Sequence, residues 1–436
     1  MDHFNDRNGT LHAEDVDLTA LAGAVGTPLY VYSTATIQRH YRVFAEAVAG
    51  LTSPADEAPL IAYAVKANPN LSVVATLARL GAGADVVSEG EMRRALAAGV
   101  PPERVVFSGV GKTRGEMAAA LAAGIYQFNV EGEAELHVLS EVAAALRVTA
   151  AVALRVNPGV DARTHAKIST GGRENKFGIA LDRVPAAYAL AASLPGLRAV
   201  GVGAHIGSQL TALAPLEATF GLLGDLVARL RNAGLPVERV DLGGGLGIPY
   251  RAGDPVPPTP ADYGALVRKA TAGWNVRLMF EPGRMIVGNA GVLVTRVVTV
   301  KPGDVRTFVV VDAAMNDLLR PSLYGAWHDI RAVAPAGGKM IATIVGPVCE
   351  TGDTFAEDRR IDTVAAGDLV AFMTAGAYGA TMASTYNSRP LVPEVLVDGA
   401  NWAIVRPREE IAAQLARETI APWLETATTA AAGTSA

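Results

Sequence analysis

Residues 60–70 read LIAYAVKANPN. The apolar run at 60–65 predicts a buried strand, and the Asn-Pro-Asn turn at 68–70 ends it. This strand delivers one lysine, Lys66, to its carboxyl end. Burial disfavours an ammonium ion and lowers a lysine pKa, which would keep a nucleophilic amine available for a Schiff base with a carbonyl compound. The alternative is a lysine whose ammonium group simply reaches solvent from the strand end, so this stretch alone leaves the role of Lys66 open.

Composition restricts the class of protein. The chain has 436 residues, which predicts two domains, and half of these residues are hydrophobic. Its formal net charge of −5, without a long basic run, argues against nucleic acid as a partner. The single cysteine, Cys349, allows no internal disulfide, as is usual in reducing compartments. Residues 1–10 lack the apolar core of a signal peptide, and no apolar run reaches the roughly 18 residues of a membrane span, so we expect a cytoplasmic protein without a membrane partner.

Short apolar strands alternate with Ala/Leu-rich stretches of helix length, such as 112–123, 132–146 and 216–233. Eight strands are predicted, at 60–68, 84–88, 105–109, 127–130, 151–157, 199–208, 239–243 and 276–281. Eight such alternations predict an α/β fold with a (β/α)8 TIM barrel. An open α/β sheet is the alternative, because strand boundaries interpreted from sequence shift by several residues.

After the eighth strand the pattern changes to short β-branched runs separated by glycine-containing turns, at 292–300, 307–311, 339–345, 369–373 and 394–397. The strand-like segment 27–32 is expected to join them. The predicted domains are therefore a barrel of residues 36–282 and a sandwich- or barrel-like all-β domain of residues 1–35 and 283–425. A short terminal helix is expected at 411–423, and a disordered tail at 426–436.

Candidate site residues follow the predicted barrel strands, whose carboxyl ends hold the catalytic groups in this fold. Lys66 follows the first strand, His205 the sixth, the glycine-rich run 243–247 the seventh and Glu281 the eighth. Bare glycine amides can approach a phosphate, an imidazole can stack on a cofactor ring, and a carboxylate can hold a protonated pyridine nitrogen. Each feature has a structural alternative: a simple turn, a core histidine or an ordinary ion pair. Together they predict a pyridoxal 5'-phosphate (PLP) site, and the surroundings of His205 suggest no metal.

Seven motifs extend this interpretation along the chain: YAVKANPN, HIGSQ, DLGGGLG, EPGR, NDLLRPSLY, VGPVCETGD and GAYG. In combination they resemble the alanine-racemase-like, fold type III PLP-dependent decarboxylases, and among these the meso-diaminopimelate decarboxylase family, which performs the last step of bacterial lysine synthesis. The similarity runs from about residue 27 to residue 408. One departure lies at 88–90, Ser-Glu-Gly, where many relatives carry a second glycine in place of the glutamate.

The resemblance implies a role for each matching residue. It implies that Lys66 forms the Schiff base with PLP, that His205 stacks on its ring and that Glu281 pairs with the pyridine nitrogen. The residues implied around the phosphate are Ser208, Gly244, Gly245, Gly283, Arg284 and Tyr378. Those implied for the substrate are Arg284, Arg320, Tyr324, Glu350 and Tyr378.

Cys349 matches the acid that returns a proton to the substrate, and Glu350 matches a contact to the substrate amine. In the family this pair reaches the site from the other subunit, which implies a homodimer with shared active sites. From the residues alone, Arg320 could equally form a surface ion pair and Tyr324 could pack in a core. Cys349 follows a Gly-Pro turn, which is typical of an exposed loop. The polar, glycine-rich segment 161–178 is expected to be either a lid or an ordinary surface loop.

Two arginines and a tyrosine suit a substrate with more than one carboxylate. We therefore expect PLP-dependent decarboxylation of meso-2,6-diaminopimelate to L-lysine and carbon dioxide. An ornithine- or arginine-type decarboxylase is one alternative, although its substrate offers no distal carboxylate to a second arginine. A PLP-binding barrel protein without turnover is the other alternative, although such a protein needs no additional β domain with a Cys-Glu loop.

Overall fold

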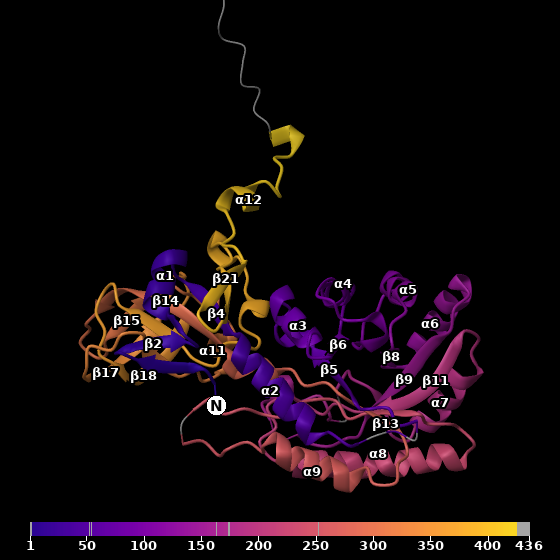
Figure 1. Ribbon diagram of the computed structural model, residues 1–436. Helices are drawn as coiled ribbons and strands as arrows, with labels where there is room; N and C mark the ends of the chain where they lie inside the picture. The colour runs from indigo at the N-terminus through magenta and orange to yellow at the C-terminus, as the bar shows by residue number, and fades with distance from the viewer. Residues whose placement is uncertain are drawn as a thin grey trace, which may run out of the picture.

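A closed barrel of parallel strands forms the larger part of the protein, seen in purple and magenta in the computed structural model (Figure 1). The structure describes residues 2–51, 53, 55–162, 164–172, 175–251 and 253–424. Within them, eight strands pair in a circle that β13 closes against β5. These strands are β5 (Leu60–Ala64), β6 (Gly83–Val86), β7 (Val105–Phe107), β8 (Gln127–Val130), β9 (Ala150–Asn157), β11 (Leu197–Gly203), β12 (Arg239–Asp241) and β13 (Arg277–Phe280). The predicted (β/α)8 barrel is confirmed over the open sheet.

Helices cover the outside of the barrel because each buries one apolar face against the strands. In the longest, α8, the buried side chains Leu216, Phe220, Leu223 and Leu230 recur at helical spacing. The helix α2, which precedes the first barrel strand, packs against both α3 and α9. The covering helices are α2 (Thr34–Ala47), α3 (Leu71–Ala78), α4 (Glu89–Ala97), α5 (Arg114–Ala123), α6 (Glu133–Leu146), α7 (Val184–Ser193), α8 (Ala214–Asn232) and α9 (Pro260–Ala270).

A second, mostly β part combines the N-terminal segment with everything that follows the barrel. Figure 1 shows its indigo N-terminal strands lying among orange and yellow ones. Its central strand β14 pairs antiparallel with β4, β15 and β19, and β4 also pairs with β20, which confirms the strand predicted at 27–32. The strands are β4 (Leu29–Ser33), β14 (Gly291–Lys301), β15 (Phe308–Val311), β16 (Ile330–Ala332), β17 (Lys339–Val345), β18 (Thr354–Asp362), β19 (Leu369–Phe372), β20 (Glu394–Asp398) and β21 (Asn401–Arg406).

Short elements complete both parts of the molecule. A small N-terminal sheet consists of β1 (Phe4–Arg7), β2 (Thr10–Ala13) and β3 (Val16–Asp17), followed by α1 (Leu18–Val25). The two-residue strand β10 (Ile179–Ala180) pairs with β9, and α10 (Arg284–Val287) leads from the barrel to β14. The domain boundary predicted at 282/283 stays a prediction. No helix among the residues that the structure describes is long and apolar enough to cross a membrane.

The terminal helix predicted for residues 411–423 is wrong in its length. Only α12 (Ile411–Leu415) is α-helical, and a separate 3₁₀ turn covers Pro422–Leu424. Ile411 and Leu415 are 59% and 66% exposed, so no tertiary packing stabilises a longer helix in this chain. The tail predicted at 426–436 lies outside the described residues.

The loop after β19 joins the two parts of the protein at Lys66. Asn68 Nδ2 donates to the Gly376 carbonyl at 3.1 Å, and the Tyr378 N–H donates to the Ala67 carbonyl at 2.8 Å. A Cβ at position 376 would lie 2.0 Å from the Val287 oxygen, so only glycine fits this close approach. The β part is therefore held directly over the rim of the barrel where β5 ends.

A buried lysine that the sequence analysis did not select ties two rim loops together. The Lys112 side chain is 1% exposed, and its ammonium donates to Glu135 Oε1 at 2.7 Å and to the carbonyls of Gly109 and Asn129 at 2.8 and 2.7 Å. Lys112→Met would leave Glu135 and two carbonyls without this donor. Losing one partner of a buried ion pair costs about 3–5 kcal/mol.

We therefore expect Lys112→Met to lower the free energy of unfolding in urea by about 3–5 kcal/mol. The matched control is Lys269→Met, because Lys269 pairs with Glu217 at the surface, where its side chain is 78% exposed. The control should lose less than about 1 kcal/mol. Equal losses in the two variants would contradict a structural role for Lys112.

Candidate active site

Lys66 lies at the rim of the barrel, in the 3₁₀ turn Val65–Ala67 that follows β5. The strand ends earlier than predicted, and the Lys66 side chain is 36% exposed with Nζ 2.6 Å from Asp85 Oδ2. Burial by itself would lower the pKa of Lys66, but the carboxylates of Asp85 and Glu281 outweigh burial and raise this pKa. The expected lowered pKa is therefore wrong, because Asp85 on the adjacent strand provides a counter-charge. The Lys66 ammonium group is paired with Asp85, while its side chain stays partly open to solvent.

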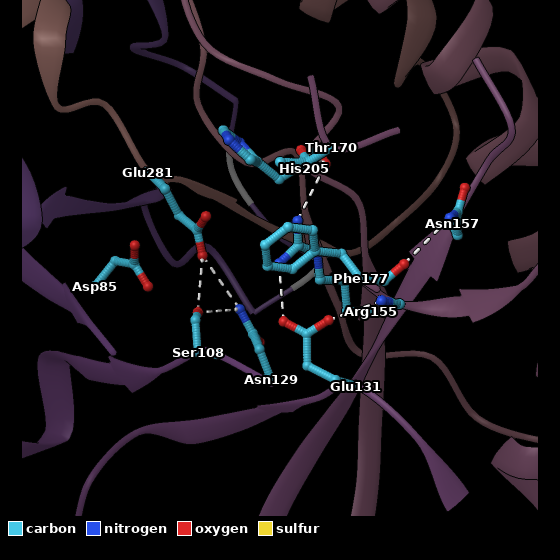
Figure 2. A network of polar contacts seen from close by, with 12 residues as sticks. Asp85, Ser108, Asn129, Glu131, Arg155, Asn157, Thr170, Phe177, His205 and Glu281 are labelled. Atoms are coloured by element: carbon cyan, nitrogen blue, oxygen red, sulfur yellow. Dashed lines mark hydrogen bonds and ion pairs between the residues drawn. The ribbon is translucent and has the colours of Figure 1, made fainter. Parts of the chain in front are cut away.

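Glu281 belongs to a group of buried acids at the floor of the site (Figure 2). Asn129 Nδ2 donates to Glu281 Oε1 at 3.1 Å and to Asp241 Oδ2 at 2.9 Å, and the Ser108 hydroxyl lies 3.4 Å from Glu281 Oε1. Burial and the nearby Asp241 carboxylate raise the pKa of Glu281 well above its usual range, and burial also raises the pKa of Asp241. Burial and the mutual repulsion of two carboxylates therefore both disfavour a second negative charge at this place.

His205 follows β11 and keeps a neutral imidazole. The Gly244 N–H lies 3.2 Å from Nδ1, which makes Nδ1 an acceptor and leaves the proton on Nε2. Burial, Arg155 and Lys66 hold the pKa of His205 well below 6.5. The His205 carbonyl accepts from the Thr170 hydroxyl at 2.8 Å and from Arg155 Nη2 at 3.3 Å, and Figure 2 shows the second of these contacts. His205, Glu281 and Lys66 line one cavity of about 430 Å³.

The six residues predicted around a phosphate lie together. They line a smaller hollow that also contacts Lys66: Ser208, Gly244, Gly245, Gly283, Arg284 and Tyr378. Gly245 has φ +113°, and a Cβ there would lie 2.4 Å from the Gly207 oxygen, so a bare backbone is required. Arg284 donates to the Ser208 hydroxyl at 3.1 and 3.2 Å. The hollow thus combines backbone amides, a hydroxyl and a guanidinium group.

A third cavity, of about 340 Å³, continues from Lys66 toward the β part of the molecule. Arg284, Arg320, Tyr324 and Tyr378 line it. Arg320 is 6% exposed, and it forms no ion pair with any other residue that the structure describes. The alternative of a surface ion pair is therefore wrong for Arg320, and Tyr324 faces a cavity and is not buried in a core. The cavity thus offers two guanidinium groups, of Arg284 and Arg320, that form no ion pair with any residue the structure describes.

Cys349 and Glu350 lie apart from this group. Both are exposed in the loop after β17, as expected for a Gly-Pro turn, and Glu350 accepts from the Tyr386 hydroxyl at 3.0 Å. Within the described part of the chain, neither Cys349 nor Glu350 is among the residues that line the three cavities described around Lys66.

The described part of segment 161–178 lies over the site. Thr170 and Phe177 line the cavity of Glu281, and His165 lies edge-on to Tyr324 at 5.9 Å. Lys167 Nζ also donates to the Leu323 carbonyl at 3.0 Å. The segment thus contributes side chains to both the 430 Å³ and the 340 Å³ cavity, and its role as a lid stays a prediction.

The sequence analysis missed several polar residues of the site, namely Asp85, Ser108, Asn129, Arg155 and Asp241. Four of them stand at or just after the carboxyl ends of β6, β7, β8 and β12. The signal that selected Lys66 and Glu281, a polar residue at a strand end, would have found these as well. Arg155 pairs with Glu131 at 2.8 Å and lies over the Phe177 ring. No group of three or more metal-ligating side chains occurs within the described ranges.

Comparison with known proteins agrees with this geometry. Residues 34–288 match the family model of the pyridoxal-dependent decarboxylases, pyridoxal binding domain. The diaminopimelate decarboxylase of Zymomonas mobilis is 51% identical over 421 residues, covering 97% of this chain and 99% of the relative. The chain belongs to the diaminopimelate decarboxylase family. The Pseudomonas aeruginosa member of that family is 52% identical over 424 residues, covering 97% of this chain and all of the relative.

A solved structure of the family has the same architecture. The diaminopimelate decarboxylase of M. jannaschii in complex with L-lysine superposes with a TM-score of 0.92 at 37% identity, covering 97% of this chain and 99% of that one. The family assignment therefore extends over both the barrel and the β part. PLP is the cofactor of the pyridoxal-dependent decarboxylases to which the chain belongs.

Proposed function

We propose that this protein decarboxylates meso-2,6-diaminopimelate to L-lysine and carbon dioxide with PLP as cofactor, the last step of lysine biosynthesis. The observation that supports this substrate best is Arg320, a buried guanidinium group without an ionic partner among the described residues. A second carboxylate at the far end of the substrate would provide that partner. The family's members from other organisms are named for this activity, and one of them binds L-lysine.

The residues at the rim fit PLP by their chemistry. A lysine, a neutral imidazole and two buried acids surround one cavity, and glycine amides with a guanidinium group surround the adjoining hollow. When bound, PLP supplies an electron sink for the electrons of the bond between Cα and the carboxylate. Lys66 would hold its carbonyl carbon and His205 would lie on its ring. The phosphate would be held by Ser208, Gly244, Gly245, Gly283, Arg284 and Tyr378.

Glu281 would face the pyridine nitrogen. The Asn129 amide holds the side chains of both Glu281 and Asp241 in place. A protonated ring nitrogen withdraws electrons more strongly than a neutral one. Glu281 would thus hold a proton on the ring nitrogen, with Asp241 as a second buried acid beside that contact.

Arg320 and Tyr324 would hold the distal amino-carboxylate end of the substrate, together with Arg284 and Tyr378. Cys349 and Glu350 would complete the site from a second copy of the chain, with Cys349 returning a proton to Cα and Glu350 contacting the substrate amine. The exposure of both residues in this chain supports a homodimer with shared sites. We further propose a cytoplasmic enzyme whose partners are this amino acid and its own second copy.

Release of carbon dioxide from a panel of amino acids tests this proposal. With PLP present, we expect turnover of meso-2,6-diaminopimelate and none of ornithine, arginine or lysine, because these three offer no second carboxylate to Arg320. Turnover of ornithine or arginine at a similar rate would favour the other type of decarboxylase. No turnover of any amino acid by a PLP-loaded dimer would favour a non-catalytic barrel.

A first variant tests Glu281. Glu281→Gln should retain PLP but lower kcat about 10- to 100-fold, since a neutral amide cannot hold the ring nitrogen protonated and one hydrogen bond to a charged group is lost. PLP content is measured by absorbance after release from the protein, and kcat by carbon dioxide release. An unchanged kcat would remove Glu281 from this role.

A further inference from the structure

Among the residues that the structure describes, one side chain forms a hydrogen bond with Arg320, and that side chain is neutral. His328 Nε2 lies 2.9 Å from Arg320 Nη1, and His328 Nδ1 lies 2.8 Å from the Met373 carbonyl oxygen. A carbonyl only accepts, so Nδ1 carries the proton and Nε2 is left to accept from Arg320. Burial and the charge of Arg320 lower the pKa of His328 to about 3, which keeps the imidazole neutral.

His328 is itself held firmly by the β part of the protein. It is 2% exposed, and its own carbonyl accepts from Arg359 Nη1 at 3.0 Å. The next residue, Asp329, accepts through its carbonyl from the Met373 N–H at 2.8 Å. Ring and backbone of His328 are thus both bonded to neighbouring segments, and the position of Nε2 is determined by the sheet.

The remaining neighbours of Arg320 leave its charge unpaired. The Tyr250 ring lies 4.7 Å from the Arg320 guanidinium carbon and edge-on to His328 at 5.7 Å. The Tyr250 hydroxyl accepts from Arg284 Nη1 at 2.5 Å, so one ring separates the two arginines. A carboxylate in place of His328 would bind the guanidinium group as strongly as a substrate carboxylate does. A neutral acceptor such as His328 orients the guanidinium group of Arg320 without competing with a substrate carboxylate for it.

We propose that His328 is a positioning residue for substrate specificity, which orients Arg320 toward the distal carboxylate of the substrate. The inference rests on the proposed function, because it requires a substrate with such a carboxylate. Arg320 lines the 340 Å³ cavity whereas His328 is not among its lining residues, so His328 acts through Arg320 and does not touch the substrate. The Arg320 Nε atom has no partner among the described residues and remains available to a ligand.

Two amide substitutions at His328 distinguish a role in orienting Arg320 from a role in packing alone. In His328→Gln the amide group reaches about the position of Nε2 and can accept from Arg320. In His328→Asn the shorter amide can replace Nδ1 and donate to Met373, but it does not reach Arg320. We expect His328→Asn to raise KM for meso-2,6-diaminopimelate about tenfold or more, the usual effect of losing a hydrogen bond to a charged group, with a smaller change in kcat. His328→Gln should retain most of the wild-type KM.

The dissociation constant of the PLP-loaded enzyme for L-lysine, measured by calorimetry, should follow the same order. L-lysine retains one amino-carboxylate end, so its binding reports on Arg320 without turnover. Equal effects of the Asn and Gln substitutions would mean that His328 serves only to pack, and would overturn the inference.

Arg320→Ala completes the test as a double-mutant cycle. If His328 acts through Arg320, adding His328→Asn to Arg320→Ala should change KM less than about twofold. If the KM increases of the two single variants multiply in the double variant, the inference about His328 is overturned, whereas the proposed function is not. An unchanged KM in Arg320→Ala would overturn the role of Arg320 in the proposed function, and with it the inference, so the two failures are distinguishable.

Discussion

Replacing Lys66 with alanine should remove both the visible absorbance band of the bound cofactor and at least about 10³-fold of the activity. Lys66 is the only lysine among the residues that line the three cavities of the site. Its amine lies 2.6 Å from Asp85 Oδ2, and Lys66 lines the same cavity as Glu281. No other described lysine can take over its bond to the cofactor.

Absorbance spectra of the purified proteins and borohydride reduction followed by peptide mapping provide the measurement. Wild-type protein should give one reduced lysine adduct, at Lys66, and Lys66→Ala should give none. Lys269→Ala is the matched control, because Lys269 is exposed on α9 and should leave spectrum and activity unchanged. A reducible lysine adduct in Lys66→Ala would assign the cofactor bond to another residue.

Mixing two inactive variants should restore activity if the active site is shared. Lys66 lies at the barrel rim, whereas Cys349 is exposed in a loop that contributes to none of the cavities around Lys66 among the described residues. A heterodimer of Lys66→Ala and Cys349→Ala chains would contain one site with both lesions and one site with neither. Random exchange makes about half of the dimers heterodimers, so about a quarter of wild-type activity should return.

The controls for this experiment are each variant alone, taken through the same exchange procedure, and a wild-type sample treated identically. Exchange itself is checked with differently tagged chains recovered in one complex. If tagged heterodimers form and the mixture stays inactive, each chain supplies its own cysteine and the shared site is wrong.

Local sequence patterns were enough to predict the barrel and the position of three residues, Lys66, His205 and Glu281, at its rim. Apolar strands and amphipathic helices alternate with a regular period, and this period depends on near neighbours in the chain. The carboxyl ends of parallel strands meet at one rim, so Lys66, His205 and Glu281 are brought together once eight strands close. The strand at 127–130 agrees with β8 to the residue.

The β part was less accessible to sequence analysis. Strand β18 carries five charged residues and so lacks the pattern of a buried strand, and β21 is a short edge strand with a polar residue at each end. Their hydrogen bonds come from partners in β17 and β20. The insertion of β4 between β14 and β20 likewise joins residues more than 250 positions apart. Such pairings depend on tertiary contacts and have no local signal.

The electrostatic character of the site was decided only by the tertiary structure. Burial predicts a lowered pKa for Lys66, yet Asp85 on the neighbouring strand reverses the direction. His328 becomes a neutral partner of Arg320 because a carbonyl 45 residues further along holds its other nitrogen. Charge interactions depend on distances in space and on exclusion of water. Residue types along a chain determine which groups are present, whereas the folded arrangement determines which of them remain charged.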